Sequence, residues 1–211
     1  MAASGVFHLA WLTVQARKTR HVRLLGHRYQ RTLARPAEVA GIGFLTGASV
    51  RMRFHPAALY TGVVFVRSDL RPAVHIPARV DQVTGTQRRT TLGRTPAEVA
   101  LVEHVLAALA GLRIDNCMVE LDAPEPPGLD GSARHFIDVL RQAGSTLQPA
   151  PRSIYTVSNP VVVFGTRATL AIHPATTDEL KVSYALDYGL GSPIGRQLST
   201  QVVTPEQFAD W

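Results

Sequence analysis

The sequence has little or nothing of several features that define large classes of protein. One cysteine, Cys117, occurs among 211 residues, which excludes an internal disulfide and a cysteine-based zinc cluster. The apolar run Phe7–Leu12 is far shorter than the roughly 20 residues that a membrane-spanning helix needs. We therefore expect no stable insertion into a membrane.

Acidic residues are absent from the N-terminal tail, whose basic residues are Arg17, Lys18, Arg20 and Arg23. The formal net charge of +6 comes largely from this tail, so it does not indicate a nucleic-acid-binding domain. The apolar run precedes the arginines, which is the reverse of the order in a secretory signal. We expect residues 1–28 to be an N-terminal extension without stable order, with an organellar transit peptide as the alternative.

The remaining composition is that of an ordinary globular protein, with 45% hydrophobic and 18% charged residues. Cys117 alternates with Val119 and Leu121 along a predicted strand, 116–121. We expect its side chain to be buried as a small apolar residue.

The apolar pattern predicts an α+β fold. Val50, Met52 and Phe54 alternate with polar residues, as in a strand with one buried face. Further strands are predicted at 62–67 and 73–76, and helices at Pro96–Ala110 and Ala133–Ala143. The first helix has the signature of a capping box at 95–98 and a glycine stop at Gly111; the second has Ser132 as a candidate N-cap and Gly144 as its end. Strands followed by two helices predict a two-layer sandwich, a sheet plus two helices, over residues 29–146.

A second unit is predicted after a linker at 147–151. Residues 152–211 contain four strand-like segments, at 154–163, 167–173, 180–188 and 197–203. Thr204 and Pro205 then have the pattern of a helix start, six residues before the last residue, Trp211. We interpret 152–211 as the incomplete beginning of a second α+β domain of the same general type.

Glu103 and His104 interrupt the apolar pattern of the first predicted helix. A carboxylate in apolar surroundings is costly unless something pairs with it. Neighbouring helix positions project about 100° apart, so the two side chains can flank a metal-bound water but cannot meet at one point. A helix edge exposed to solvent explains the pair equally well.

An ordered set of motifs around this pair resembles the UDP-3-O-acyl-N-acetylglucosamine deacetylases, zinc amidohydrolases of lipid A biosynthesis. The resemblance extends from about Gln30 to the last residue, and its motifs are these: Gly41–Gly47, Thr90–Leu92, Val102–Gly111, Ile114–Asn116, Pro124–Glu125 and Leu129–Ser132.

The resemblance implies that Glu103 is the catalytic general base and that His104 is one ligand of a Zn²⁺ ion. It places Arg89, Thr90 and Thr91 at the rim of the active site, where arginine side chains would meet the diphosphate of the nucleotide-sugar substrate; for Arg88 and Arg89, solvated charge at a strand end is the alternative. The family's other zinc ligands and its proton donor belong to a later helix that these residues do not contain. The implied function is cytoplasmic deacetylation of UDP-3-O-acyl-N-acetylglucosamine, with this chain inactive alone. The alternative is a non-catalytic binding or scaffold homologue of the same fold.

Leu45 departs from the family, which commonly has histidine within this glycine-rich turn. Asp130 is interpreted as setting its own turn and the start of the second helix. The remaining histidines show no metal-ligand spacing and are interpreted as surface or packing residues: His8, His21, His27, His55, His75, His135 and His173.

Overall fold

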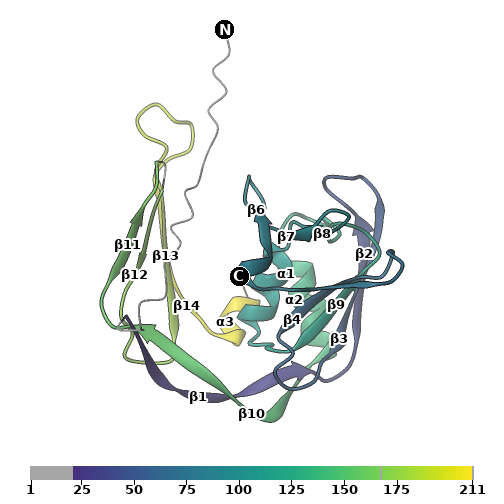
Figure 1. The fold of residues 1–211 in the computed structure, drawn as a ribbon. Coiled ribbons are helices and arrows are strands. Elements are labelled where there is room, and N and C mark those ends of the chain that lie inside the picture. Colours follow the sequence, from purple (N-terminus) through teal and green to yellow (C-terminus); the bar gives the residue numbers. More distant parts are fainter. Residues whose placement is uncertain (1–20, 167, 211) are drawn as a thin grey trace. The chain divides into compact units, whose positions relative to one another are not determined.

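The computed structural model describes residues 21–166 and 168–210, which form two units. The larger unit contains His27–Arg152 and residues 179–210, and the smaller contains residues 21–26 and Ser153–Asp178 (Figure 1). Strands predominate and helices are few, so the predicted α+β class is confirmed. The description of 152–211 as the start of a second domain of the same type stays a prediction.

The elements follow one another along the chain with these bounds: β1 Val22–Leu33, β2 Ala37–Ile42, β3 Ser49–Pro56, β4 Val63–Arg67, β5 Val74–Pro77, the 3₁₀ turn η1 Val80–Gln82, β6 Val83–Gly85, β7 Thr91–Arg94, β8 Ala97–Ala100, α1 Glu103–Gly111, β9 Cys117–Leu121, α2 Arg134–Ala143, β10 Ser145–Val157, β11 Val161–Phe164, β12 Thr169–Ile172, β13 Leu180–Leu186, β14 Gln197–Val203 and α3 Pro205–Ala209.

A five-stranded sheet is the centre of the larger unit, with strand order β2-β3-β9-β4-β5. Its pairings are antiparallel except for β4 and β9, which run parallel. Val119 of β9 lies between Phe54 of β3 and Phe65 of β4, and all three side chains are buried. The predicted alternation at 50–54 and the predicted strands at 62–67, 73–76 and 116–121 are confirmed, with small shifts of their ends.

Helices α1 and α2 pack with this sheet around one apolar core (Figure 1). Val105 and Leu109 of α1 and Leu140 of α2 are at most 1% exposed. The ring of Phe136 in α2 meets that of Phe54 edge-on, with the ring centroids 6.5 Å apart. Burial of such side chains is the main stabilising contribution to a fold of this kind.

The first helix starts later than the sequence pattern predicts. Ala97–Ala100 form strand β8, which pairs antiparallel with β7, and α1 begins only at Glu103. The capping-box interpretation of 95–98 is therefore wrong: cross-strand pairing with β7 satisfies the backbone groups that a helix would have used. Glu103 consequently lies in the first turn of α1 rather than in the middle of a helix.

Gly111 is the last residue of α1, and its role also differs from the prediction. The left-handed conformation occurs at Arg113, with φ 55°, and not at Gly111. A Cβ atom at position 111 would overlap the ring of Phe208 in α3, so the glycine provides space for α3 against α1.

The second helix begins at Arg134 instead of Ala133, and Ala133, not the predicted Ser132, occupies its N-cap position. Asp130 accepts hydrogen bonds from the backbone N–H of Ser132 at 3.0 Å and from its hydroxyl at 2.9 Å, and these bonds hold the pKa of Asp130 below its usual value. Ser132 Oγ in turn accepts from the N–H of Arg134, 3.1 Å away. Asp130 thus sets the turn that starts α2, and Gly144, with φ 70°, follows its end.

Two long strands replace the predicted linker. Residues 147–151 lie within β10, which pairs with β1. Residues 22–28, predicted to belong to the N-terminal extension, form part of β1. The first 20 residues of that extension lie outside the described residues.

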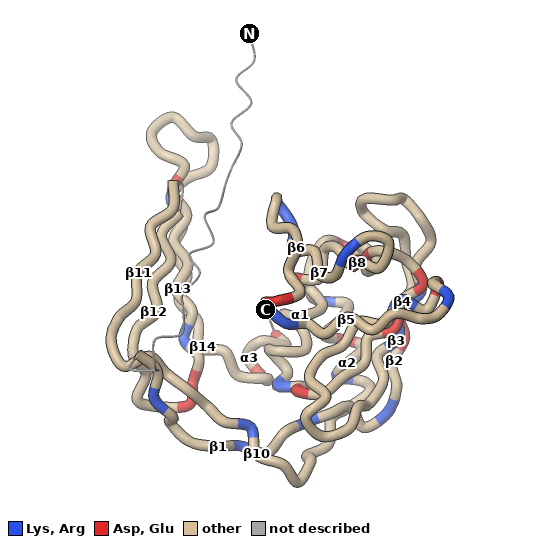
Figure 2. The backbone as a smooth tube through the Cα atoms, in the orientation of Figure 1, with Lys and Arg blue, Asp and Glu red and all other residues tan. Residues whose placement is uncertain are grey.

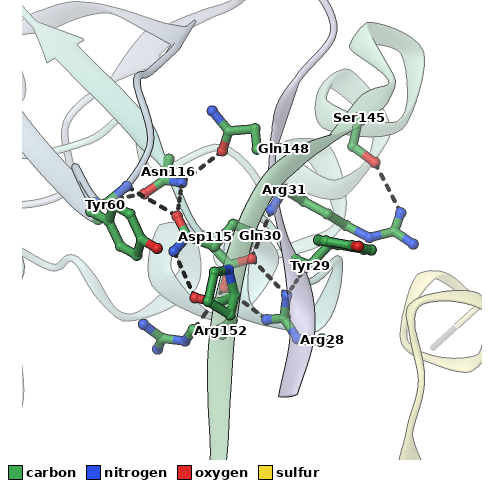
Figure 3. A network of polar contacts seen from close by, with 12 residues as sticks. Arg28, Tyr29, Gln30, Arg31, Tyr60, Asp115, Asn116, Ser145, Gln148 and Arg152 are labelled. Carbon is green, nitrogen blue, oxygen red and sulfur yellow. Dashed lines mark hydrogen bonds and ion pairs between the residues drawn. The ribbon is translucent and has the colours of Figure 1, made fainter.

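Asp115, in the loop before β9, binds the β1 segment of the larger unit (Figure 3). Its carboxylate forms a paired contact with the Arg28 guanidinium, at 2.6 and 2.7 Å, and accepts the backbone N–H of Arg31 at 2.9 Å. The Asp115 side chain is only 6% exposed. Charge-assisted contacts with this geometry are among the stronger polar interactions in proteins.

Asn116 continues the same network and is itself buried. Its side-chain amide donates to the side-chain oxygens of Gln30 and Gln148, at 2.8 and 2.7 Å, and its oxygen accepts the N–H of Gly62 at 2.8 Å. One side chain thereby joins β1, β10 and the loop before β4 (Figure 3). The side-chain nitrogen and oxygen of this buried amide both have hydrogen-bond partners, so neither carries the desolvation penalty of an unpaired buried polar group.

Shorter antiparallel pairs complete each unit. In the smaller unit β11 pairs with β12, and in the larger one β13 pairs with β14. The predicted helix start after β14 is confirmed: the Thr204 side chain accepts the N–H of Gln207, and Pro205 is the first residue of α3. The predicted strand at 154–163 is divided between β10 and β11.

Among the described residues, no helix has the length and apolar character to cross a bilayer.

Cys117 is fully buried on β9, as predicted, and burial raises the pKa of its thiol to about 12. Because the thiolate is the reactive form, we expect the native protein not to react with an aromatic disulfide reagent at pH 8. The unfolded protein should release one equivalent of thiol per chain. Rapid reaction of the folded protein would contradict the burial of Cys117.

Gly111→Ala should destabilise the protein because the added methyl group meets the Phe208 ring. We expect a loss of about 1–3 kcal/mol, typical of overpacking, measured by denaturant unfolding. Gly26→Ala is the matched control, since a Cβ at position 26 has no neighbour within 4 Å. Equal stability of the two variants would contradict the packing of α3 on α1.

Candidate active site

Glu103 is the first residue of α1, immediately after a sharp reversal of the chain. Strand β8 ends at Ala100, Leu101 has φ 56°, and the helix begins two residues later. The free N–H groups at a helix N-terminus favour a negative charge in the first turn. The position of Glu103 therefore offsets part of the cost of holding a carboxylate above an apolar core.

The two oxygens of the Glu103 carboxylate have different surroundings. Oε1 accepts a hydrogen bond from the backbone N–H of Thr90. Oε2 is buried and has no hydrogen-bond partner; it is the one such side-chain atom among residues 21–166 and 168–210. A buried carboxylate oxygen without a donor is costly, which is typical of a group whose partner is a ligand.

His104 follows Glu103 and is exposed at the surface of α1. Because adjacent helix residues project about 100° apart, the imidazole and the Glu103 carboxylate leave α1 in different directions. Within the described ranges, no three histidine, cysteine, aspartate or glutamate residues come together as a metal site.

The three residues predicted to bind substrate divide into two groups. Thr90 contributes the backbone N–H that holds Glu103. Arg89 and Thr91 instead line a neighbouring pocket of about 280 Å³. The loop between β6 and β7 carries Arg89 and includes Arg88 in a left-handed conformation, with φ 59°. Figure 2 shows basic and acidic residues interspersed along the chain.

The pocket is bounded by the glycine-rich turn, the β6-β7-β8 sheet and the segment before α2. Its lining residues are Leu45, Thr46, Thr84, Gly85, Arg89, Thr91, Glu98, Ala100, Pro124 and Glu125. Leu45, where the family resemblance would place a histidine, therefore adds an apolar side chain to this wall.

Glu125 is the residue of this pocket whose importance the sequence analysis missed. It is 1% exposed, although a glutamate is rarely buried so completely. The available signal was its position between Pro124 and the pair Pro126–Pro127, where a charge interrupts a rigid apolar segment. Its hydrogen-bond donors come from the turn at 43–47, far away in the sequence, and no local pattern reveals them.

The other described histidines either contact an acidic side chain or are exposed. His55 contacts Glu120 of β9 at 2.9 Å, and His135 lies 3.4 Å from Asp130. His75 and His173 are exposed. His8 lies outside the described residues.

The sequence matches the family model for UDP-3-O-acyl N-acetylglycosamine deacetylase over residues 30–211. It is 40% identical over 173 residues to a UDP-3-O-acyl-N-acetylglucosamine deacetylase from Hahella chejuensis. The aligned residues cover 82% of this chain and 57% of that protein. Proteins with the same name from Myxococcus xanthus and Chlamydia abortus are each 41% identical, over 75% and 86% of this chain and 50% and 64% of their own lengths. The chain thus spans between half and two thirds of these relatives.

Zinc should bind to this chain only weakly, because His104 offers one strong nitrogen ligand and stable zinc sites use three or four protein ligands. We expect far less than one equivalent of zinc after purification and dialysis, measured by elemental analysis. Stoichiometric zinc that survives dialysis would contradict this ligand assignment and direct attention to His75 and Asp130.

Proposed function

This chain belongs to the UDP-3-O-acyl N-acetylglycosamine deacetylase family, and from that premise we propose that it carries the general base and one metal ligand of a zinc-dependent deacetylase. The substrate we propose is UDP-3-O-acyl-N-acetylglucosamine, from which the enzyme would remove acetate in lipid A biosynthesis, in the cytoplasm. The observation that carries the proposal is the buried, unpartnered Oε2 of Glu103 beside His104.

Glu103 suits the role of general base because its two oxygens are not equivalent. The Thr90 N–H holds Oε1 and limits rotation of the carboxylate. Oε2 is left with an open acceptor site, and a water molecule there could lose its proton to the carboxylate as it attacks the amide carbonyl. The leaving amine would take its proton from the family's separate proton donor, which the resemblance places on the later helix.

A zinc ion would be held in part by His104. The described residues alone do not fit the ion, because no three histidine, cysteine, aspartate or glutamate side chains among them come together. We propose that the other ligands come from polypeptide outside residues 21–210. A bound zinc would make its water more acidic and would polarise the carbonyl group.

Arg89 and Thr91 suit a role in holding the nucleotide sugar. Both line the pocket next to the loop that contacts Glu103. A guanidinium can pair with two phosphate oxygens at once, and the Thr91 hydroxyl can donate to or accept from a sugar hydroxyl. We propose that the diphosphate binds on this side of the site.

Substitutions can distinguish the proposed roles of Glu103 as general base and His104 as zinc ligand. They are made in a protein that joins this chain to the remaining part of the family polypeptide. Glu103→Ala should lower turnover by roughly 10²–10⁴-fold and leave zinc in place, because it removes the base alone. His104→Ala should lose both zinc and turnover, because two remaining ligands hold zinc poorly. Turnover is measured by acetate release, and zinc by elemental analysis.

Glu38→Ala and His55→Ala are the matched controls, since their side chains pair with Arg53 and Glu120 and are not part of the proposed site. They should keep normal turnover and zinc content. Near-normal turnover of Glu103→Ala in an active protein would overturn the assignment of Glu103. A joined protein that folds and binds the substrate but never releases acetate would favour the non-catalytic binding or scaffold homologue.

A further inference from the structure

The glycine-rich turn between β2 and β3 forms one wall of the pocket, although its side chains have little contact with the core. The N–H of Gly43 donates to the Ala48 carbonyl at 2.9 Å, and the N–H of Gly47 donates to the Gly43 carbonyl at 3.1 Å. These two bonds close the loop. Leu45 and Thr46 at its centre are exposed, so burial of their side chains does not hold them in place.

Glu125 fills the interior of this loop with a carboxylate. The backbone N–H of Leu45 donates to Oε2 at 2.9 Å, and the N–H of Thr46 donates to Oε1 at 2.7 Å. The Thr46 hydroxyl donates to Oε1 as well, also at 2.7 Å. Consecutive backbone N–H groups that converge on one anion form the concavity known as a nest.

None of the described cationic side chains shares this buried charge. Among the described residues, no lysine, arginine or histidine lies within ion-pair distance of Glu125, so the donors of the turn are its counterpart. A carboxylate buried without such donors would be strongly destabilising. Loss of the carboxylate group would equally leave the N–H groups of Leu45 and Thr46 without their acceptor.

Gly43 makes room for the carboxylate. A Cβ atom at position 43 would lie 2.5 Å from Oε1 of Glu125 and 2.9 Å from the Thr46 hydroxyl. Gly43 is buried and does not have a positive φ, so the glycine is needed for space and not for backbone freedom. Gly43 and Glu125 therefore depend on each other in space, although 82 positions separate them in the numbering.

We propose that Glu125 is a positioning residue for the pocket. Its carboxylate holds Leu45 and Thr46 where they form the wall that faces Arg89 and Thr91. It acts on the binding of the ligand and not on the chemical step, which belongs to Glu103. The identity of the ligand rests on the proposed function, but the positioning of the turn does not.

The positioning itself can be measured on this chain by NMR, without substrate. In Glu125→Gln, a carboxamide replaces the charged acceptor and brings an NH₂ group toward existing donors. The amide hydrogens of Leu45 and Thr46 should exchange roughly 10–100-fold faster, the factor expected for loss of a charge-assisted hydrogen bond. Their proton resonances should also move upfield, whereas the amides of Phe65 and Val119 should keep their exchange rates.

Matched variants separate this effect from general damage to the fold. Glu120→Gln makes the same change on β9 and should leave the turn unaffected. Thr46→Val, which removes one donor at the surface and leaves the core intact, should speed the exchange of the two amides; Thr46→Ser should restore it. Unchanged exchange at Leu45 and Thr46 in both Glu125→Gln and Thr46→Val would overturn the proposal.

The effect on the pocket is measured in the joined, active protein. Glu125→Gln should raise KM by about tenfold or more and leave kcat within about twofold, in contrast to Glu103→Ala. A variant with a loosened turn but unchanged KM, or with reduced kcat and unchanged KM, would overturn the link between Glu125 and ligand binding. Absence of turnover in every form, including the parent protein, would overturn the proposed function and leave the NMR result for the turn standing.

Discussion

The hydrogen bond from the Thr90 N–H to the Glu103 carboxylate is the contact on which the candidate site depends. It joins the residue that precedes β7 to the first turn of α1. The pairing of β7 with β8 and the reversal at Leu101 bring these elements together. With one carboxylate oxygen held, the other has a defined position and an unused acceptor site. A freely rotating carboxylate would present no such preference.

Contacts elsewhere in the larger unit hold α1 in the position where Glu103 accepts this hydrogen bond. Val105 and Leu109 anchor the helix in the core formed with the five-stranded sheet. Beyond its C-terminus, Asp115 and Asn116 bind β1 and β10 through buried polar contacts. The carboxylate of Glu125 uses a similar principle on the other wall of the pocket, where backbone donors fix a charged group. Buried polar groups that are fully hydrogen-bonded can fix geometry in this way, whereas apolar packing alone is less directional.

Local patterns in the sequence were sufficient for the central strands, for α2 and for the helix start at Thr204, because each depends on neighbouring residues. They were misleading at 95–98, where a capping-box pattern lies in a strand: pairing with β7, a tertiary contact, outweighs a local preference. The Glu103–His104 pair was identified from its apolar surroundings and from the family motifs. Glu125 could not be identified, because its donors are contributed by a turn about 80 residues earlier and only folding brings them together.

Hydrogen exchange of the Thr90 amide is the most direct test of whether this amide holds the Glu103 carboxylate. In the parent protein, the Thr90 amide should be protected although it precedes β7 and lies outside the strand's pairing. In Glu103→Ala, it should exchange roughly 10–100-fold faster, while the amides of Val105 and Val119 keep their rates. Equal exchange of the Thr90 amide in the two proteins would contradict the account, because Glu103 would then have no fixed position from which to act as a base.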